Sequence, residues 1–295
     1  MGPPSSLALA TPQGGRPPTA RQSRIRVGKL GRHLRRHSLL LALGALAGCA
    51  VTPAPVAPEV RAALAPTGAL RIGVYPGSPT SLVRGPGPQE MRGLTVEIGS
   101  ELARRLGVPA EIVVFGRVPE IVAGLKNGKA DFTITNASPA RALDLDFTPT
   151  LVSLESSHLV PAGSRMQTLA DVDRPGNRVG VAQGGTSHAT LTRDLKQAIV
   201  VPAPSVTAAT EMLRKGELDS FASNKGILFE MADHLPGARV LAGHWGLEHL
   251  AVGVPKGREA GAAYLKSFVS DAATRALVQQ AAQRVGLRGL AADKP

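Results

Sequence analysis

Asn136 and Asn224 each end a short strand-like run, and the segments that lead up to the two asparagines are similar in sequence. Residues 120–136 align with residues 208–224 at a constant offset of 88, and each unit is a helical pattern, a glycine, an aspartate and a short β-type run. The other coinciding pairs are Gly128 with Gly216 and Asp131 with Asp219. A Gly-x-x-Asp pattern is common at helix-to-strand turns, so we interpret the aspartates as structural. The asparagines lie just past the carboxyl ends of strands, where open α/β sheets bind ligands.

The elements that must position these asparagines alternate between strand and helix. Residues 70–75 alternate apolar and polar side chains, as in a strand, and residues 94–106 carry apolar side chains at helical spacing. A second series of strands and helices starts at residue 178, and two helical stretches, at about 258–269 and 271–285, close the chain. This alternation predicts the α/β class with a parallel sheet. The internal repeat predicts two similar α/β lobes.

Positive charge is concentrated near the N-terminus. The chain has a net charge of +12, but residues 1–48 hold eight basic residues and no acidic one, which leaves +4 for the rest. Aromatic residues make up only 3%, which argues against nucleic-acid binding through base stacking. The single cysteine, Cys49, excludes an intramolecular disulfide and a cysteine zinc cluster. The histidines lack the spacing of a helical metal pair, so neither a metal nor a cofactor is expected.

Residues 1–48 have the organisation of an export leader. A basic region precedes an apolar run of about ten residues at 38–47, which is too short to span a bilayer and typical of a signal peptide. The run ends in Leu-Ala-Gly-Cys49, which resembles the bacterial lipoprotein signal, whose cysteine is lipidated and becomes the first residue of the mature protein. This resemblance implies a periplasmic protein anchored to a membrane through Cys49. Residues 49–66, rich in proline and alanine, are expected to form a semi-extended tether.

Five segments in a fixed order carry a family resemblance: LRIGVYPG, GLTVEIGSELARRLGV, GLKNGKADFTITNASPARALDLDFT, TLADVDRPGNRVGVAQGGTS and LRKGELDSFASN. Together they resemble the family 3 extracellular solute-binding proteins, the ligand-capturing subunits of ABC importers for polar amino acids and related solutes. The resemblance covers about residues 70–290. It implies a two-lobed, type II periplasmic-binding-protein fold with a discontinuous first lobe and a ligand cleft that closes by a hinge. The expected division is lobe 1 at 67–157 and 251–295, and lobe 2 at 158–250.

The resemblance also assigns ligand contacts. The segment from Asn136 to Arg141 is similar to a family segment that ends in Thr-Pro-Glu-Arg, whose arginine grips the ligand carboxylate. A guanidinium fork suits this task; a surface ion pair with Asp144 or Asp146 is the alternative for Arg141. At Gly185 and Thr186, a turn that opens a helix can offer backbone N–H groups to an anion. The full set of expected contacts is Tyr75, Thr135, Asn136, Arg141, Gly185, Thr186 and Asn224.

Departures from the family pattern bear on the ligand. The family's acidic residue, which holds an α-ammonium group, falls at or beside Asn224, which has no charge, and the usual aromatic residues are missing near 78–81 and Val118. A small amino-acid-like, carboxylate-bearing or neutral polar solute is therefore expected. The sequence does not support a pocket that recognises a positive charge on the solute. Residues 243–249 come just before the expected return crossing between the lobes. We interpret them as a packed turn, with a place in the cleft as the alternative.

Three functions compete on this fold. The leading hypothesis is a monomeric receptor that hands its solute to ABC permease subunits and performs no chemical step. A periplasmic enzyme is the second, because some dehydratases share the fold; it would need a catalytic acid or base in the cleft, such as Glu248 or a histidine. A ligand-sensing subunit for a signalling receptor is the third.

Overall fold

A computed structural model describes residues 56–292, apart from 86 and 88–89. The predictions for the leader and for Cys49 lie outside these residues. The strands are β1 (Leu70–Val74), β2 (Val83–Arg84), β3 (Met91–Arg92), β4 (Ala110–Val114), β5 (Thr133–Asn136), β6 (Leu145–Phe147), β7 (Val152–Val160), β8 (Arg178–Ala182), β9 (Ile199–Ala203), β10 (Ser220–Asn224), β11 (Arg239–Val240) and β12 (Gly246–Pro255). The helices are α1 (Pro58–Leu64), α2 (Leu94–Leu106), α3 (Val118–Lys126), α4 (Pro139–Ala142), α5 (Thr186–Asp194), α6 (Val206–Arg214), α7 (Lys225–Asp233), α8 (Glu259–Ser270) and α9 (Ala272–Arg284). None of the helices in this part of the chain is both long and apolar enough to span a bilayer.

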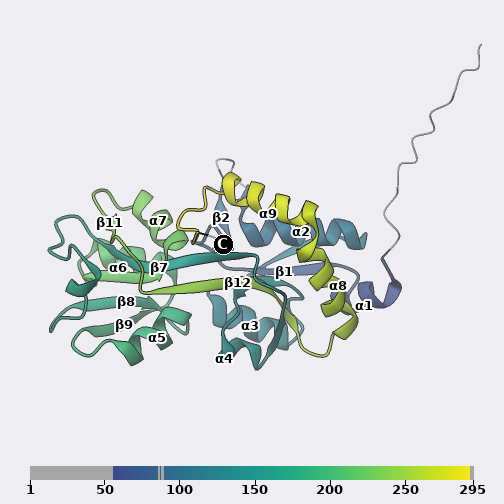
Figure 1. The fold of residues 1–295 in the computed structure, drawn as a ribbon, viewed down its shortest axis with the longest axis horizontal. Helices are drawn as coiled ribbons and strands as arrows, with labels where there is room; N and C mark the ends of the chain where they lie inside the picture. Colours follow the sequence, from purple (N-terminus) through teal and green to yellow (C-terminus); the bar gives the residue numbers. More distant parts are fainter. Residues whose placement is uncertain (1–55, 86, 88–89, 293–295) are drawn as a thin grey trace, which may run out of the picture. The chain divides into compact units, whose positions relative to one another are not determined.

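Two long strands, β7 and β12, form the centre of the main sheet (Figure 1). The strand order is β5-β12-β7-β10-β8-β9, with β6 paired to β12 and β11 to β7. A parallel pair, β1 and β4, adjoins β5 through a bridge between Ile72 and Phe132. The α/β class is confirmed. The sheet is mixed rather than wholly parallel, because β7 and β12 run antiparallel to each other and to β10 and β5.

The apolar core is divided along the chain. One cluster joins α2 to β1, α8 and α9, and it includes Ile72, Leu102, Leu265 and Val278. A second cluster forms around Phe221 of β10 and packs α6 and α7 onto the other part of the main sheet. The first cluster combines early and late parts of the sequence, while the second comes from the middle. The fold is therefore two-lobed, with a discontinuous first lobe.

The repeated aspartates have the structural role that the sequence indicated. Asp131, fully buried, accepts hydrogen bonds from Arg71 Nε at 2.7 Å and Nη2 at 2.8 Å, while Arg71 also donates to the carbonyl of Gly128. Asp219 likewise accepts from Arg178 Nε at 3.0 Å and Nη2 at 2.9 Å, and Arg178 donates to the carbonyl of Gly216. Both glycines have φ near +68° (67° and 69°), a conformation that favours glycine. Each arginine thereby ties the turn after a helix to the start of a strand.

The expected tether, residues 49–66, is wrong for its last part. Pro58–Leu64 forms helix α1, with proline in the first turn, where its missing N–H is tolerated. Leu64 is fully buried, and a Cβ on Gly261 of α8 would lie 2.6 Å from its side chain. Because Leu64 is buried in close contact with Gly261, the segment is held on the first lobe. Its content of proline and alanine had wrongly indicated an extended tether.

Candidate functional site

A cavity brings residues of both core clusters together, with a volume of about 60 Å³ open to the centre of a water-sized sphere. The site is therefore small in this conformation. All the expected contacts line it: Tyr75, Thr135, Asn136, Arg141, Gly185, Thr186 and Asn224. The strand-end asparagines therefore meet at one site, as the sequence indicated. Their role in ligand binding stays a prediction.

Arg141 faces the cavity and forms no ion pair with any residue that the structure describes. It lies in the short helix α4, which Ser138 caps by accepting from the Arg141 N–H at 3.4 Å. Its Nη1 donates to Thr135 Oγ1 at 2.8 Å and to the carbonyl of Asn136 at 3.2 Å. Asp144 pairs instead with Lys126, at 2.8 Å, and no described carboxylate lies within 4 Å of Arg141. Burial lowers the pKa of Arg141, and the surface-pair alternative is absent from the described contacts.

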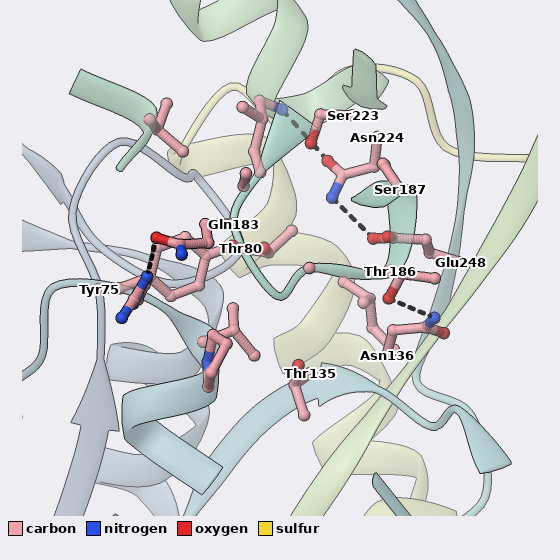
Figure 2. Close-up of a pocket in the computed structure, with 18 of the residues that line it drawn as sticks. Tyr75, Thr80, Thr135, Asn136, Gln183, Thr186, Ser187, Ser223, Asn224 and Glu248 are labelled. Carbon is pink, nitrogen blue, oxygen red and sulfur yellow. Dashed lines mark hydrogen bonds between the residues drawn. The ribbon is translucent and has the colours of Figure 1, made fainter. Parts of the chain in front are cut away.

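Asn136 links the two lobes across the cavity. Its Nδ2 donates to Thr186 Oγ1 at 3.2 Å (Figure 2). Its Oδ1 accepts from the backbone N–H of His249 at 2.9 Å. The N–H of Gly185 donates to the carbonyl of Ala182 at 2.9 Å. The N–H of Gly185 is therefore used within the turn, and the expectation that this turn offers N–H groups to an anion stays a prediction for Thr186. Close contact between the lobes identifies this as a closed conformation.

Asn224 carries the site's largest correction. Its Oδ1 caps α7 by accepting from Ile227 N at 3.2 Å, and its Nδ2 donates to Glu248 Oε2 at 2.8 Å. Figure 2 shows the two side chains pointing toward each other. Glu248 thus places a carboxylate next to the position where the sequence lacks one. Residues 246–249 belong to strand β12, so the packed-turn interpretation of 243–249 is wrong for them.

Burial shapes the electrostatics around Glu248. Desolvation raises the pKa of its carboxyl, against the opposing effects of Asn224, Arg141 and Thr186. Burial also raises the pKa of Tyr75, so its phenol is a neutral wall of the site. Glu248 is half-buried, and even partial removal of a carboxylate from water is costly unless it has partners. Glu248 has one neutral amide donor and a cationic neighbour, which leaves room for a positively charged group of a ligand.

A second guanidinium also lines the cavity, and the sequence analysis did not single it out. Arg117 precedes α3 and donates through Nη1 to Gln183 Oε1. Its position just before Val118-Pro119, at a helix start, was the available signal. Glu248 gave a weaker signal, because its strand only becomes part of the cleft through pairing with β7. Among the described residues, no group of histidine, cysteine and acidic side chains could hold a metal ion.

Comparisons with known proteins identify the family. The sequence profile of the bacterial extracellular solute-binding proteins, family 3, matches residues 70–284. The chain belongs to this family. Over 197 residues, 64% of this chain and 72% of the relative, it is 23% identical to the ABC transporter glutamine-binding protein GlnH of Bacillus subtilis (strain 168). The family is extracellular, which implies a periplasmic location for this family 3 protein.

Solved structures agree on the fold. A solute receptor for L-cysteine of Neisseria gonorrhoeae is 22% identical, with a TM-score of 0.68 over 76% of this chain and 92% of the receptor. An ancestral amino acid-binding protein, described as a precursor of cyclohexadienyl dehydratase, is 19% identical, with a TM-score of 0.64 over 74% of this chain and 95% of its own. The predicted type II periplasmic-binding-protein fold is thereby confirmed.

Proposed function

We propose that this family 3 protein is the receptor of an amino acid ABC importer and binds a small solute that carries both a carboxylate and an ammonium group. One observation carries the proposal: the guanidinium of Arg141, which has no ion pair within residues 56–292 as far as these are described, and the carboxylate of Glu248 line the same small cavity. These are the complementary charges of a zwitterion. The name of the Bacillus subtilis relative, an ABC transporter glutamine-binding protein, supports the class.

The two charged groups have separate roles in the proposal. Arg141 receives the solute carboxylate through its fork, because Thr135 and the Asn136 carbonyl already hold the guanidinium in place. Glu248 receives the ammonium group, supported by Asn224. Thr186 and Asn136 complete the polar wall. A solute that contacts both lobes at once favours the closed form, which is the requirement for ligand-driven closure.

The lobe boundaries stay part of the proposal: lobe 1 at 67–157 and 251–295, to which helix α1 is now added, and lobe 2 at 158–250. Strand β12 pairs with β5 of the first lobe, β7 pairs with β10 of the second, and the two strands pair with each other, so they are the natural hinge. Because closure changes the surface shared by the lobes, permease subunits of the importer can distinguish the liganded form. The protein acts as a monomer in this proposal and has no chemical step.

A thermal-shift screen against the common amino acids tests the proposal. A solute at a hundred times its Kd stabilises the folded state by about 2.7 kcal/mol, so at least one amino acid is expected to raise the Tm clearly. The matched controls are the deaminated acid and the decarboxylated amine of that amino acid, which are expected to give little shift. No shift with any amino acid, or an equal shift with a control lacking one charge, contradicts the proposal.

We also propose lipid anchoring through Cys49, from the sequence signal alone. Cys49→Ser is expected to move the protein from the membrane fraction to the soluble periplasmic fraction, because acyl chains supply the membrane affinity. Fractionation with metabolic fatty-acid labelling measures this, and wild-type protein is the control. Label retained by Cys49→Ser would refute the assignment.

A dehydratase-like enzyme is the second candidate, since Glu248, an acid that this function requires, does line the cavity. The structural neighbour described as a precursor of cyclohexadienyl dehydratase gives the candidate its substrate class. Incubation of purified protein with prephenate, followed by product analysis, separates the candidates. Turnover that Glu248→Gln abolishes would favour the enzyme over the receptor.

A further inference from the structure

We infer that the solute is an acidic amino acid, with Arg117 as the residue that selects its side-chain carboxylate. This inference rests on the proposed function, in which Arg141 and Glu248 hold the two backbone charges of the solute. It adds a third charged contact that neither the family resemblance nor the comparisons assign.

Charges that line the cavity do not cancel. The described lining residues with a formal charge are Arg117, Arg141 and Glu248. A neutral zwitterion satisfies Arg141 and Glu248 and leaves Arg117 with Glu120, outside the lining of the cavity, as its charged partner. A solute with two carboxylates and one ammonium group has a net charge of −1, which complements all three. The exposed pair with Glu120 contributes little free energy, so a side-chain carboxylate of the solute can still gain a charge-assisted contact with Arg117, which a neutral amino acid cannot offer.

Arg117 has donors available for such a group. Its Nε donates to Glu120 Oε1 at 3.0 Å, and its Nη1 donates to Gln183 Oε1. Among the described residues, Nη2 has no hydrogen-bond partner within these contacts. The pair with Glu120 is exposed, at 33% for Arg117 and 47% for Glu120, and such pairs contribute little free energy. The amide oxygen of Gln183 is a neutral acceptor that a carboxylate can displace.

The geometry separates Arg117 from the ammonium subsite. In Figure 2, Gln183, the partner of Arg117, lies on the opposite side of the pocket from Glu248. Gln183 follows β8 of the second lobe, whereas Arg117 belongs to the first. A side-chain carboxylate between them replaces a contact that already joins the lobes, so its binding also supports closure. The solute then lies with its ammonium group at Glu248 and its side chain toward Arg117.

L-Glutamate and L-glutamine test this inference, because they match in size and differ in the charge of one group. Isothermal titration of the purified protein is expected to give an affinity for L-glutamate about tenfold or more above that for L-glutamine, as charge-assisted hydrogen bonds are about twice as strong as neutral ones. Arg117→Gln is expected to remove this preference by weakening L-glutamate about tenfold or more, with L-glutamine changed less than about threefold.

Arg104→Gln is the matched control, since Arg104 also pairs with a glutamate three residues away, Glu101, on the surface of α2. It is expected to leave both affinities unchanged. Tighter binding of L-glutamine than of L-glutamate, or equal loss of both in Arg117→Gln, overturns the inference and leaves the proposed receptor function standing. Failure of every amino acid to bind overturns both.

Discussion

Arg141→Ala is expected to weaken solute binding by about 2–5 kcal/mol, which corresponds to about 30-fold to several thousand-fold in Kd. The guanidinium is largely buried, has no described carboxylate within 4 Å, and is held by Thr135 and the Asn136 carbonyl. Its removal leaves the solute carboxylate in the cavity without its charged partner. Titration calorimetry and the ligand-induced change in Tm measure the loss.

The fold is expected to survive this change, because Arg141 makes no ion pair within the described contacts and its burial has a desolvation cost. The Tm of empty Arg141→Ala is expected to equal or exceed that of the wild type. Arg141→Lys keeps the charge but loses the fork, so an intermediate affinity is expected. Arg193→Ala, at a 74% exposed arginine of α5, is the control. Undiminished binding by Arg141→Ala would remove its carboxylate role.

Glu248→Gln is expected to change affinity and stability in opposite directions. An ammonium group loses its carboxylate partner, so affinity for the solute falls by about 2–4 kcal/mol. The empty protein gains stability, because burial raises the pKa of Glu248 and its ionised form is therefore disfavoured in the folded state. Glutamine keeps an oxygen that accepts from Asn224 Nδ2. A merely structural role for Glu248 would lower the Tm without this selective loss of affinity.

Glu248 is also expected to determine whether the affinity for the solute rises or falls with pH. With a folded-state pKa above the ordinary value of 4.5, Glu248 gains a proton as the pH falls through that raised pKa. An ammonium group favours the ionised carboxylate, so wild-type affinity is expected to decrease with falling pH in this window. Arg141 and Tyr75 interact electrostatically with Glu248, but their ordinary pKa values are much higher. Both side chains therefore stay protonated in this pH window. Glu248→Gln is expected to lack this dependence.

A double variant that moves the carboxylate from position 248 to position 224 completes the test of Glu248. The double variant Glu248→Gln with Asn224→Asp places the carboxylate at position 224 instead of 248. The two side chains are neighbours, since Asn224 Nδ2 lies 2.8 Å from Glu248 Oε2. Aspartate can also cap α7 in place of Asn224. Partial recovery of affinity is expected relative to Glu248→Gln alone. No recovery, with an intact fold, would show that the position of Glu248 matters more than its charge.

Local pattern was sufficient for much of this protein. Helix α2 begins and ends where the periodicity and Gly107 indicated, and the repeated Gly-x-x-Asp units form the two matching arginine-bound turns. The strand-end asparagines were correctly placed at one cavity. Helix α2 depends on residues close in sequence, whereas the arginines that bind the two aspartates lie 60 and 41 residues away from them, and it was the repeat in the sequence that indicated a common structure. Segment 58–64 is the exception, since its helix packs against Gly261, far along the chain.

By itself, the sequence determined the α/β class, the two similar lobes and the place of Arg141 near a strand-end site. Only the tertiary structure decided the charge of that site. Asn224 alone suggested a site without an acid, but β12 pairs with β7, which pairs in turn with β10, and Glu248 thereby reaches Asn224. Arg117 also lines the cavity, where it donates a hydrogen bond to Gln183 of the other lobe. Charge balance in a cleft depends on strand register and lobe contact, which neighbouring residues in the sequence do not encode.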